Sequence, residues 1–179
     1  MSAILPRLES CVIKAMLQDS TTNTADALSF AILTGASSVT VSNHGVHIDT
    51  DYASFVLNFY GGASQESQEF PAVNVWAVDA QGYDAAMPWV KRVTLNIALR
   101  YPADNSTEVA NVPAAMNGVA LWLDNLTSYK RVLMDLVEAS DNKLAISFVG
   151  PANCSRGVES DKRQTYMLWT MEVVCSMNP

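Results

Sequence analysis

The stretch that decides the predicted fold is Val90-Lys-Arg-Val-Thr-Leu-Asn-Ile-Ala-Leu-Arg-Tyr101. Its apolar residues fall on one side of an extended chain: Val93, Leu95, Ile97, Leu99 and Tyr101. The alternate positions are polar or small: Arg92, Thr94, Asn96, Ala98 and Arg100. Such alternation predicts a β-strand with one face on a core and the other toward water. We therefore expect Leu95 and Ile97 to be buried and Arg92 and Asn96 to be exposed. Pro102 ends the strand, because proline cannot donate to the next ladder bond.

Two further strands are predicted around this one. After Pro71, residues 72–77 alternate in the same way, and residues 79–88 form a turn region around Gly82. The two strands then form an antiparallel hairpin with a long connection. A final strand over 165–177 places one set of side chains on one face: Met167, Trp169, Met171, Val173 and Cys175.

The first third of the chain is predicted to form a β-hairpin and one further strand. Residues 39–41 and 46–48 are apolar-rich and flank Ser42-Asn43-His44-Gly45, which favours a hairpin in which Gly45 is able to take a positive φ. Residues 54–60 predict another strand, which Gly61-Gly62 ends. The polar stretch 63–69 is expected to be a loop or an arm.

Helical periodicity appears in four places. The spacing predicts a helix over 5–17, then a polar loop over 19–24. A short helix over 25–33 has a β-strand as its alternative. Pro113 begins a helix to about Leu123, residues 124–127 interrupt it, and Thr127 or Ser128 caps a helix to about Ala139. With a strand over 144–149 and a polar loop over 150–163, the whole chain, 1–179, is predicted as a single α+β domain: a mainly antiparallel sheet with helices packed on one side.

Composition narrows the functional classes. The net charge of −7 disfavours a nucleic-acid binder, because acidic surfaces repel phosphates at long range. No apolar run approaches the length of about 18 residues that would span a bilayer. The N-terminus lacks the basic and apolar regions of a signal peptide, so we expect no export.

Cysteine usage agrees with a cytosolic setting. The three cysteines, Cys11, Cys154 and Cys175, have unrelated spacings and are expected to be reduced thiols. Cys11 and Cys175 lie on apolar faces and are interpreted as packing residues, whereas Cys154 is the one thiol expected to be exposed.

No catalytic motif is present. The sequence has no nucleophile elbow, phosphate-binding glycine loop or dinucleotide fingerprint. His44 and His47 make a poor metal site without cysteine or carboxylate at ligand spacing, although Asp49 and Asp51 are close.

The remaining polar candidates lie in predicted loops. The aspartates Asp79, Asp84 and Asp104 suit turns. The Asn-x-Ser/Thr matches at Asn105, Asn125 and Asn153 carry little weight without a secretion signal. We expect no cofactor and no metal.

The order of elements resembles that of the tail-terminator and tail-completion (neck) proteins of long-tailed bacteriophages. The matching features are the N-terminal helix over 5–17, the step Phe70-Pro71-Ala72-Val73-Asn74-Val75 and the long strand 93–101. The helix 113–123 and a basic loop running into 165–177 complete the match. The resemblance implies a non-enzymatic virion subunit, assembled in the host cytoplasm, that forms a homo-oligomeric ring between tail tube and head connector. A tube or capsid-associated role fits the same features.

Candidate interface residues follow from exposure and loop composition. Trp89, beside Pro88 at a strand entrance, is a candidate interface anchor. The loops 63–69 and 150–163 are candidate arms, which contribute Ser64, Gln65, Glu66, Ser67, Cys154 and Arg156. Ordinary core or surface positions explain the same residues. The alternative function is a small cytosolic enzyme or ligand-binding domain that uses His44, His47 and nearby aspartates.

Overall fold

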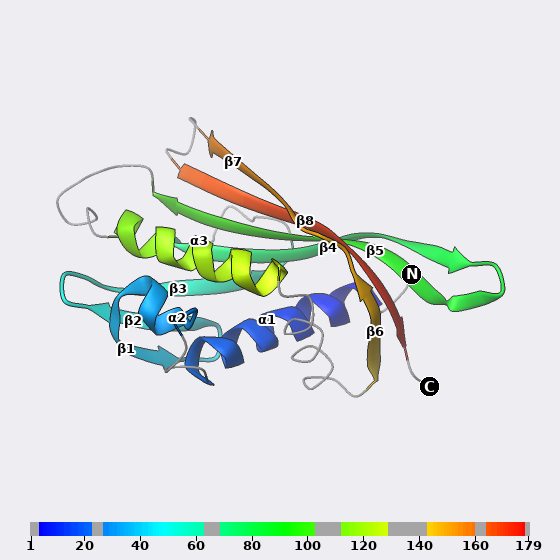
Figure 1. The fold of residues 1–179 in the computed structure, drawn as a ribbon, viewed down its shortest axis with the longest axis horizontal. Helices are drawn as coiled ribbons and strands as arrows, with labels where there is room; N and C mark the ends of the chain where they lie inside the picture. Colours follow the sequence, from blue (N-terminus) through cyan, green and yellow to red (C-terminus); the bar gives the residue numbers. More distant parts are fainter. Residues whose placement is uncertain are drawn as a thin grey trace.

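The alternating stretch forms the central strand of a large sheet. In the computed structural model it is β5 (Met87–Pro102), paired antiparallel with β4 (Ala72–Asp84) on one side and β8 (Gln164–Met177) on the other (Figure 1). The structure describes residues 4–22, 27–62, 69–102, 112–128, 143–159 and 164–177.

The sheet has eight strands, and most neighbours are antiparallel. One side continues from β4 through β3 (Ser54–Gly61) and β2 (Gly45–Thr50) to the edge strand β1 (Ala36–Val41). On the other side, β6 (Leu144–Val149) and β7 (Asn153–Glu159) lie one after the other along β8, facing residues 173–177 and 164–170 respectively. Among the described strands, only β3 and β4 pair in parallel. The predicted mainly antiparallel α+β fold is confirmed.

Three helices cover one face of the twisted sheet (Figure 1). They are α1 (Ile4–Thr22), α2 (Phe30–Thr34) and α3 (Val112–Ser128). Beneath them, Leu95, Ile97 and Leu99 of β5 are fully buried in one core with the apolar faces of α1 and α3. Burying a side chain of this size stabilises the fold by roughly 1.5–3 kcal/mol. This free energy is gained only if the helices cover the apolar face of β5, so that face determines on which side of the sheet they lie.

The helix ends differ from the predicted ones. The predicted loop over 19–24 is helical as far as Thr22, because Ser20 and Thr22 donate their hydroxyls to the carbonyls of Leu17 and Gln18. Of the helix predicted over 25–33, the described residues from 27 onward are helical only from Phe30, where α2 begins. Ser29 caps its start by accepting from the Ile32 N–H at 3.4 Å, and Gly35, with φ 67°, ends it.

The predicted break in α3 at residues 124–127 is wrong. Thr127 donates its hydroxyl to the Leu123 carbonyl at 2.8 Å, a bond compatible with a continuing helix, and α3 runs to Ser128. Gly118 allows close packing of α3 on α2, since a Cβ there would overlap the Leu33 carbonyl. The helix predicted as far as Ala139 lies outside the described residues.

The predicted turn region over 79–88 is also wrong. β4 continues to Asp84 and β5 begins at Met87, so the long connection is a two-residue turn at Ala85 and Ala86. The pairing register shifts between Val78 and Gln81, where Asp79 takes a φ of 55°. Aspartate tolerates this left-handed conformation, and a bulge lets a strand bend and continue. Turn-forming residues therefore mark irregularities inside a long hairpin.

The predicted hairpin forms as β1 and β2, and Gly45 has no positive φ in it. Gly45 instead allows β2 and β3 to lie close together, because a Cβ there would come within 2.9 Å of the Leu57 carbonyl oxygen on β3. The predicted loop over 150–163 contains β7, which pairs with β8.

The far face of β5 is less exposed than the alternation predicts. Arg92 is exposed as expected, but Asn96 is only 8% exposed and Ala98 only 1%. Asn96 lies opposite Trp76 on β4 and Thr170 on β8, and the Thr170 hydroxyl donates to its side-chain oxygen at 2.8 Å. Cross-strand neighbours cover this polar residue.

Replacing Leu95 by alanine tests the assignment of the core face. We expect Leu95→Ala to lower the free energy of unfolding by about 2–5 kcal/mol, because it leaves a cavity under the helices. The matched control is Leu121→Ala on the exposed side of α3, for which a change within about 0.5 kcal/mol is expected. Urea denaturation measures both, and equal losses would contradict the assigned face.

Candidate functional site

The end of the β4–β5 hairpin is the most exposed apolar part of the described sheet. Residues 78–89, here called the arm, extend past the helices at the right of Figure 1. The arm leaves four large apolar side chains exposed: Val78, Tyr83, Met87 and Trp89. Trp89 is 60% exposed, which is unusual for the side chain with the largest apolar area. An exposed apolar cluster of this kind is typical of a binding surface.

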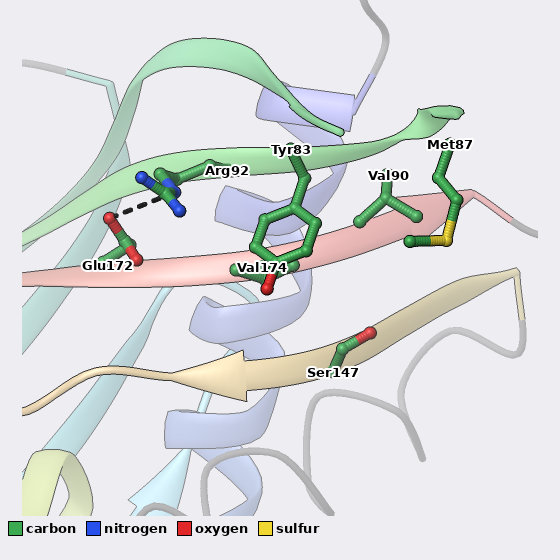
Figure 2. A pocket seen from close by; sticks show the side chains of 7 residues that line it. All are labelled: Tyr83, Met87, Val90, Arg92, Ser147, Glu172 and Val174. Carbon is green, nitrogen blue, oxygen red and sulfur yellow. Dashed lines mark ion pairs between the residues drawn. The ribbon is translucent and has the colours of Figure 1, made fainter. Parts of the chain in front are cut away.

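A cavity of about 590 Å³ lies at the base of the arm, on the sheet face opposite the helices. Figure 2 shows its lining: Tyr83, Met87, Val90, Arg92, Ser147, Glu172 and Val174. Val90 and Val174 come from neighbouring strands and form an apolar floor, and Tyr83 lies over one side. The cavity exists because β4, β5, β8 and β6 contribute side chains to one face.

Charged groups occupy one wall of this cavity. Arg92 Nε lies 3.4 Å from Glu172 Oε2, and the guanidinium carbon lies 5.5 Å from the centre of the Tyr83 ring. Both members of the ion pair are about half exposed, so the pair adds little to stability. Its effect is to hold a cation against an aromatic ring beside an apolar floor, a combination suited to a side chain or ligand that is aromatic and carries a hydrogen-bond donor.

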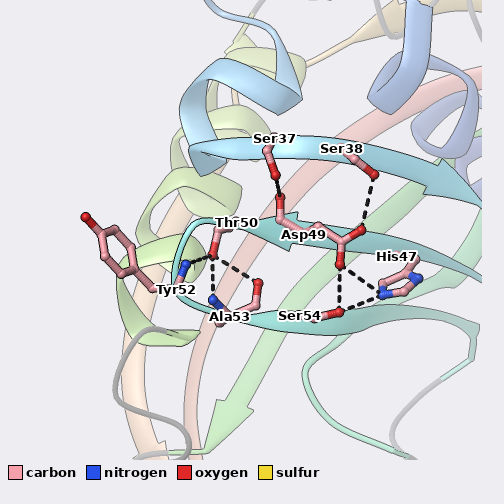
Figure 3. Close-up of polar contacts among 8 residues, drawn as sticks. All are labelled: Ser37, Ser38, His47, Asp49, Thr50, Tyr52, Ala53 and Ser54. Carbon is pink, nitrogen blue, oxygen red and sulfur yellow. Dashed lines mark hydrogen bonds and ion pairs between the residues drawn. The ribbon is translucent and has the colours of Figure 1, made fainter.

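A polar cluster lies on the opposite half of the sheet, over β1 to β3 (Figure 3). Ser54 donates its hydroxyl to Asp49 Oδ1 at 2.7 Å, and Ser38 donates to Asp49 Oδ2 at 3.2 Å. His47 Nε2 lies 2.8 Å from Ser54 Oγ and 3.4 Å from Asp49 Oδ1. The carboxylate of Asp49 thus ties three neighbouring strands together.

This cluster does not have the geometry of a catalytic triad. In a triad the imidazole uses one nitrogen for the serine and the other for the carboxylate. Here the same nitrogen of His47 faces both groups, and the Ser54 proton is committed to Asp49. Below it, Thr50 closes the β2–β3 turn by accepting from the Ala53 N–H and donating to the Ala53 carbonyl. The contacts of the cluster stabilise strands and a turn.

The two histidines do not share a site. His44 lies in the β1–β2 turn and borders a separate hollow beside α1, whereas His47 points into the cluster of Figure 3. Within the described ranges, no three histidine, cysteine, aspartate or glutamate residues are grouped closely enough to hold a metal ion. Asp79 and Asp84 lie on the arm, and Asp104 lies outside the described residues.

The predicted interface residues are distributed over two parts of the sheet. Trp89 lies on the arm and is exposed. Cys154 and Arg156 are exposed, but they belong to β7 and not to a loop. Ser64, Gln65, Glu66 and Ser67 lie outside the described residues. The remaining thiols, Cys11 and Cys175, are buried as predicted.

Sequence analysis missed the cavity and the polar cluster. Tyr83 and Glu172 are far apart along the chain, and only the pairing of β4, β5 and β8 brings them to one cavity. No signal in the sequence indicated the cavity. The Asp49 cluster had a weak signal, since Ser38, His47, Asp49 and Ser54 all lie in or directly beside the predicted strands around this hairpin.

No family model matches the chain, and no curated protein matches it. No helix in the described part of the chain is long and apolar enough to cross a membrane.

The Asp49 cluster predicts a pH effect. Hydrogen bonding from Ser54 is the main cause that lowers the pKa of Asp49, with smaller contributions from Ser38 and His47; partial desolvation opposes them. A lowered pKa in the folded state stabilises the fold above the pKa of the unfolded chain, and this contribution is lost as the pH falls through the folded pKa. We expect Ser54→Ala to raise the Asp49 pKa, measured by NMR titration. An unchanged titration midpoint would contradict the assignment.

The three thiols should differ in reactivity. Burial raises the pKa of Cys175 to about 11, and partial burial together with Asp124 raises the pKa of Cys154. We expect a thiol reagent at pH 8 to label Cys154 first, more slowly than a free thiol, because less thiolate is present. Cys11 and Cys175 should react only as the protein unfolds. A Cys154→Ser variant is the control, and rapid labelling of that variant would contradict the burial of the other two.

Proposed function

We propose that this protein is a structural subunit of a bacteriophage virion, a tail-terminator or neck protein that forms a homo-oligomeric ring between tail tube and head connector. The observation that carries the proposal is the arm, whose exposed side chains include Trp89 and Tyr83. Aromatic residues with exposed apolar area are enriched in the buried centres of protein interfaces. A subunit that assembles has a use for such a surface, whereas a free monomer gains nothing from it.

The edge strand β1 gives independent support. Its sequence, Ala-Ser-Ser-Val-Thr-Val, contains no charged residue and no proline, and Val41 at its end is exposed. Its outer edge pairs with no other described strand. Natural proteins protect exposed edges with charge, proline or bulges, because an open edge pairs with other chains. Apart from a register shift between Ala36 and Ser38 at its start, β1 has none of these protections, which suits a protein whose neighbours cover this edge.

The charge of the chain fits a ring through which DNA passes. Only 16% of residues are charged, and the net charge is −7. A low charge reduces the desolvation cost of subunit contacts, and acidic groups repel the phosphate backbone. DNA would therefore move through such a ring without adhering to it.

Self-association tests the proposal. We expect light scattering after size-exclusion chromatography to show a concentration-dependent oligomer, and negative-stain images to show rings. Binding to purified tail tubes that lack their terminal ring is the second measurement, because the end of a tube presents the template on which a ring closes. The control is binding to capsids without a connector, which offer no such template.

A chain that stays monomeric at every concentration and does not bind to tail tubes would overturn the proposal. Bound metal, lost after substitution of both His44 and His47 by alanine, would instead support the ligand-binding alternative.

A further inference from the structure

The arm presents a projection, the exposed Trp89, and a cavity that this side chain does not line. Val90 and Arg92 both line the cavity, and successive residues of a strand point to opposite faces. The pairing of β5 with β8 is unbroken from Val90 onward, so Lys91 lies on the other face. The β4–β5 register shifts between Lys91 and Met87, the stretch that holds Trp89. Trp89 is therefore an exposed side chain outside the cavity of its own chain.

The cavity suits an indole ring. Its volume of about 590 Å³ falls within the range of about 300–1,000 Å³ that accommodates small organic groups. Val90 and Val174 would contact the apolar ring. Arg92 offers a cation to the ring face, a pairing for which tryptophan is the best aromatic partner. Glu172 offers a carboxylate to the indole N–H, which has no partner among the described residues.

The charges beside the projection and in the cavity are complementary. Lys91 follows Trp89 by two residues, so it would approach the cavity of a neighbouring copy together with the tryptophan. The cavity contains Glu172, whose side chain is 44% exposed and forms an ion pair with Arg92. A carboxylate can accept several hydrogen bonds, so Glu172 could also accept one from a lysine that enters beside this pair. Opposite charges at the rim of a contact favour its correct orientation.

We propose that Trp89 of one copy inserts into the Tyr83–Arg92–Glu172 cavity of a second copy of this chain. The proposal rests on the proposed ring assembly and names its contact. Because Trp89 does not line the cavity of its own chain, projection and cavity are different surfaces and the contact is head-to-tail: each subunit donates one tryptophan and accepts another. Contacts of this kind continue from subunit to subunit and close into rings when the rotation permits. A two-fold dimer would require one surface patch to face itself.

The experiment uses two variants with complementary defects. Trp89→Ala removes the projection and keeps the cavity. Ser147→Phe fills the cavity from an exposed position on β6 and keeps the projection. We expect either variant alone to associate about 30-fold or more weakly than the wild type, as for an interface hot spot. An equimolar mixture should form a one-to-one dimer and nothing larger, since it contains one intact projection and one open cavity.

Two further variants serve as controls. Leu121→Ala removes an apolar side chain of similar exposure on α3, away from the arm, and should assemble like the wild type. Trp89→Phe keeps an aromatic ring but loses the N–H donor, so it should assemble more weakly than the wild type and more strongly than Trp89→Ala. Circular dichroism melting curves verify that each variant is folded.

The outcomes separate this contact from the proposed function. If Trp89→Ala assembles like the wild type, the tryptophan contact is overturned and ring assembly stands. If both single variants fail and their mixture also fails to form a dimer, Trp89 does not enter this cavity and the proposal is overturned. If the wild type itself neither associates nor binds tail tubes, the proposed function is overturned.

Discussion

The pairing of β5 on both sides is the constraint on which the rest of the structure depends. β5 pairs with β8 without interruption, from Val90 opposite Ser176 to Pro102 opposite Gln164. It pairs with β4 from Arg100 opposite Ala72 to Met87 opposite Asp84. Pairing on both sides satisfies backbone groups of the longest described strand within the sheet, which permits the burial of its central residues, 95–99. With the ladder in place, the alternation of β5 assigns Leu95 and its neighbours to the helices and Arg92 to the opposite face.

The helices are held on the sheet by specific hydrogen bonds in addition to apolar packing. Trp122 of α3 donates its indole N–H to Asp19 of α1 at 2.7 Å, in a buried environment, and its ring meets Phe30 of α2 edge to face at 4.8 Å. Trp169 of β8 donates to Asp124 of α3 at 2.5 Å. Each tryptophan buries a large ring and satisfies its polar atom. These bonds define how the three helices sit on one another and on β8.

The two faces of the sheet therefore serve different purposes. The helix face is a closed core of large apolar side chains. The opposite face is polar and small in the middle, where Asn96 and Thr170 bond to each other, and opens into the Arg92–Glu172 cavity at the arm. Most of the buried apolar area that stabilises the fold lies on the helix face. The second face and the arm can therefore contact other chains without disturbing the core. Trp89 differs from Trp122 and Trp169 in this respect, because it contributes nothing to the core.

The sequence by itself determined the central strand, the core face with Leu95 and Ile97, and the fold class, because side-chain alternation is a local property of an extended chain. It also singled out Trp89 through the neighbouring proline. Tertiary structure alone decided that residues 79–84 and 87–88 are strand, that β7 exists and that Asn96 is buried, because pairing with a distant strand overrides local turn signals. It also decided the cavity, since Tyr83, Arg92 and Glu172 meet only when three strands lie side by side in register.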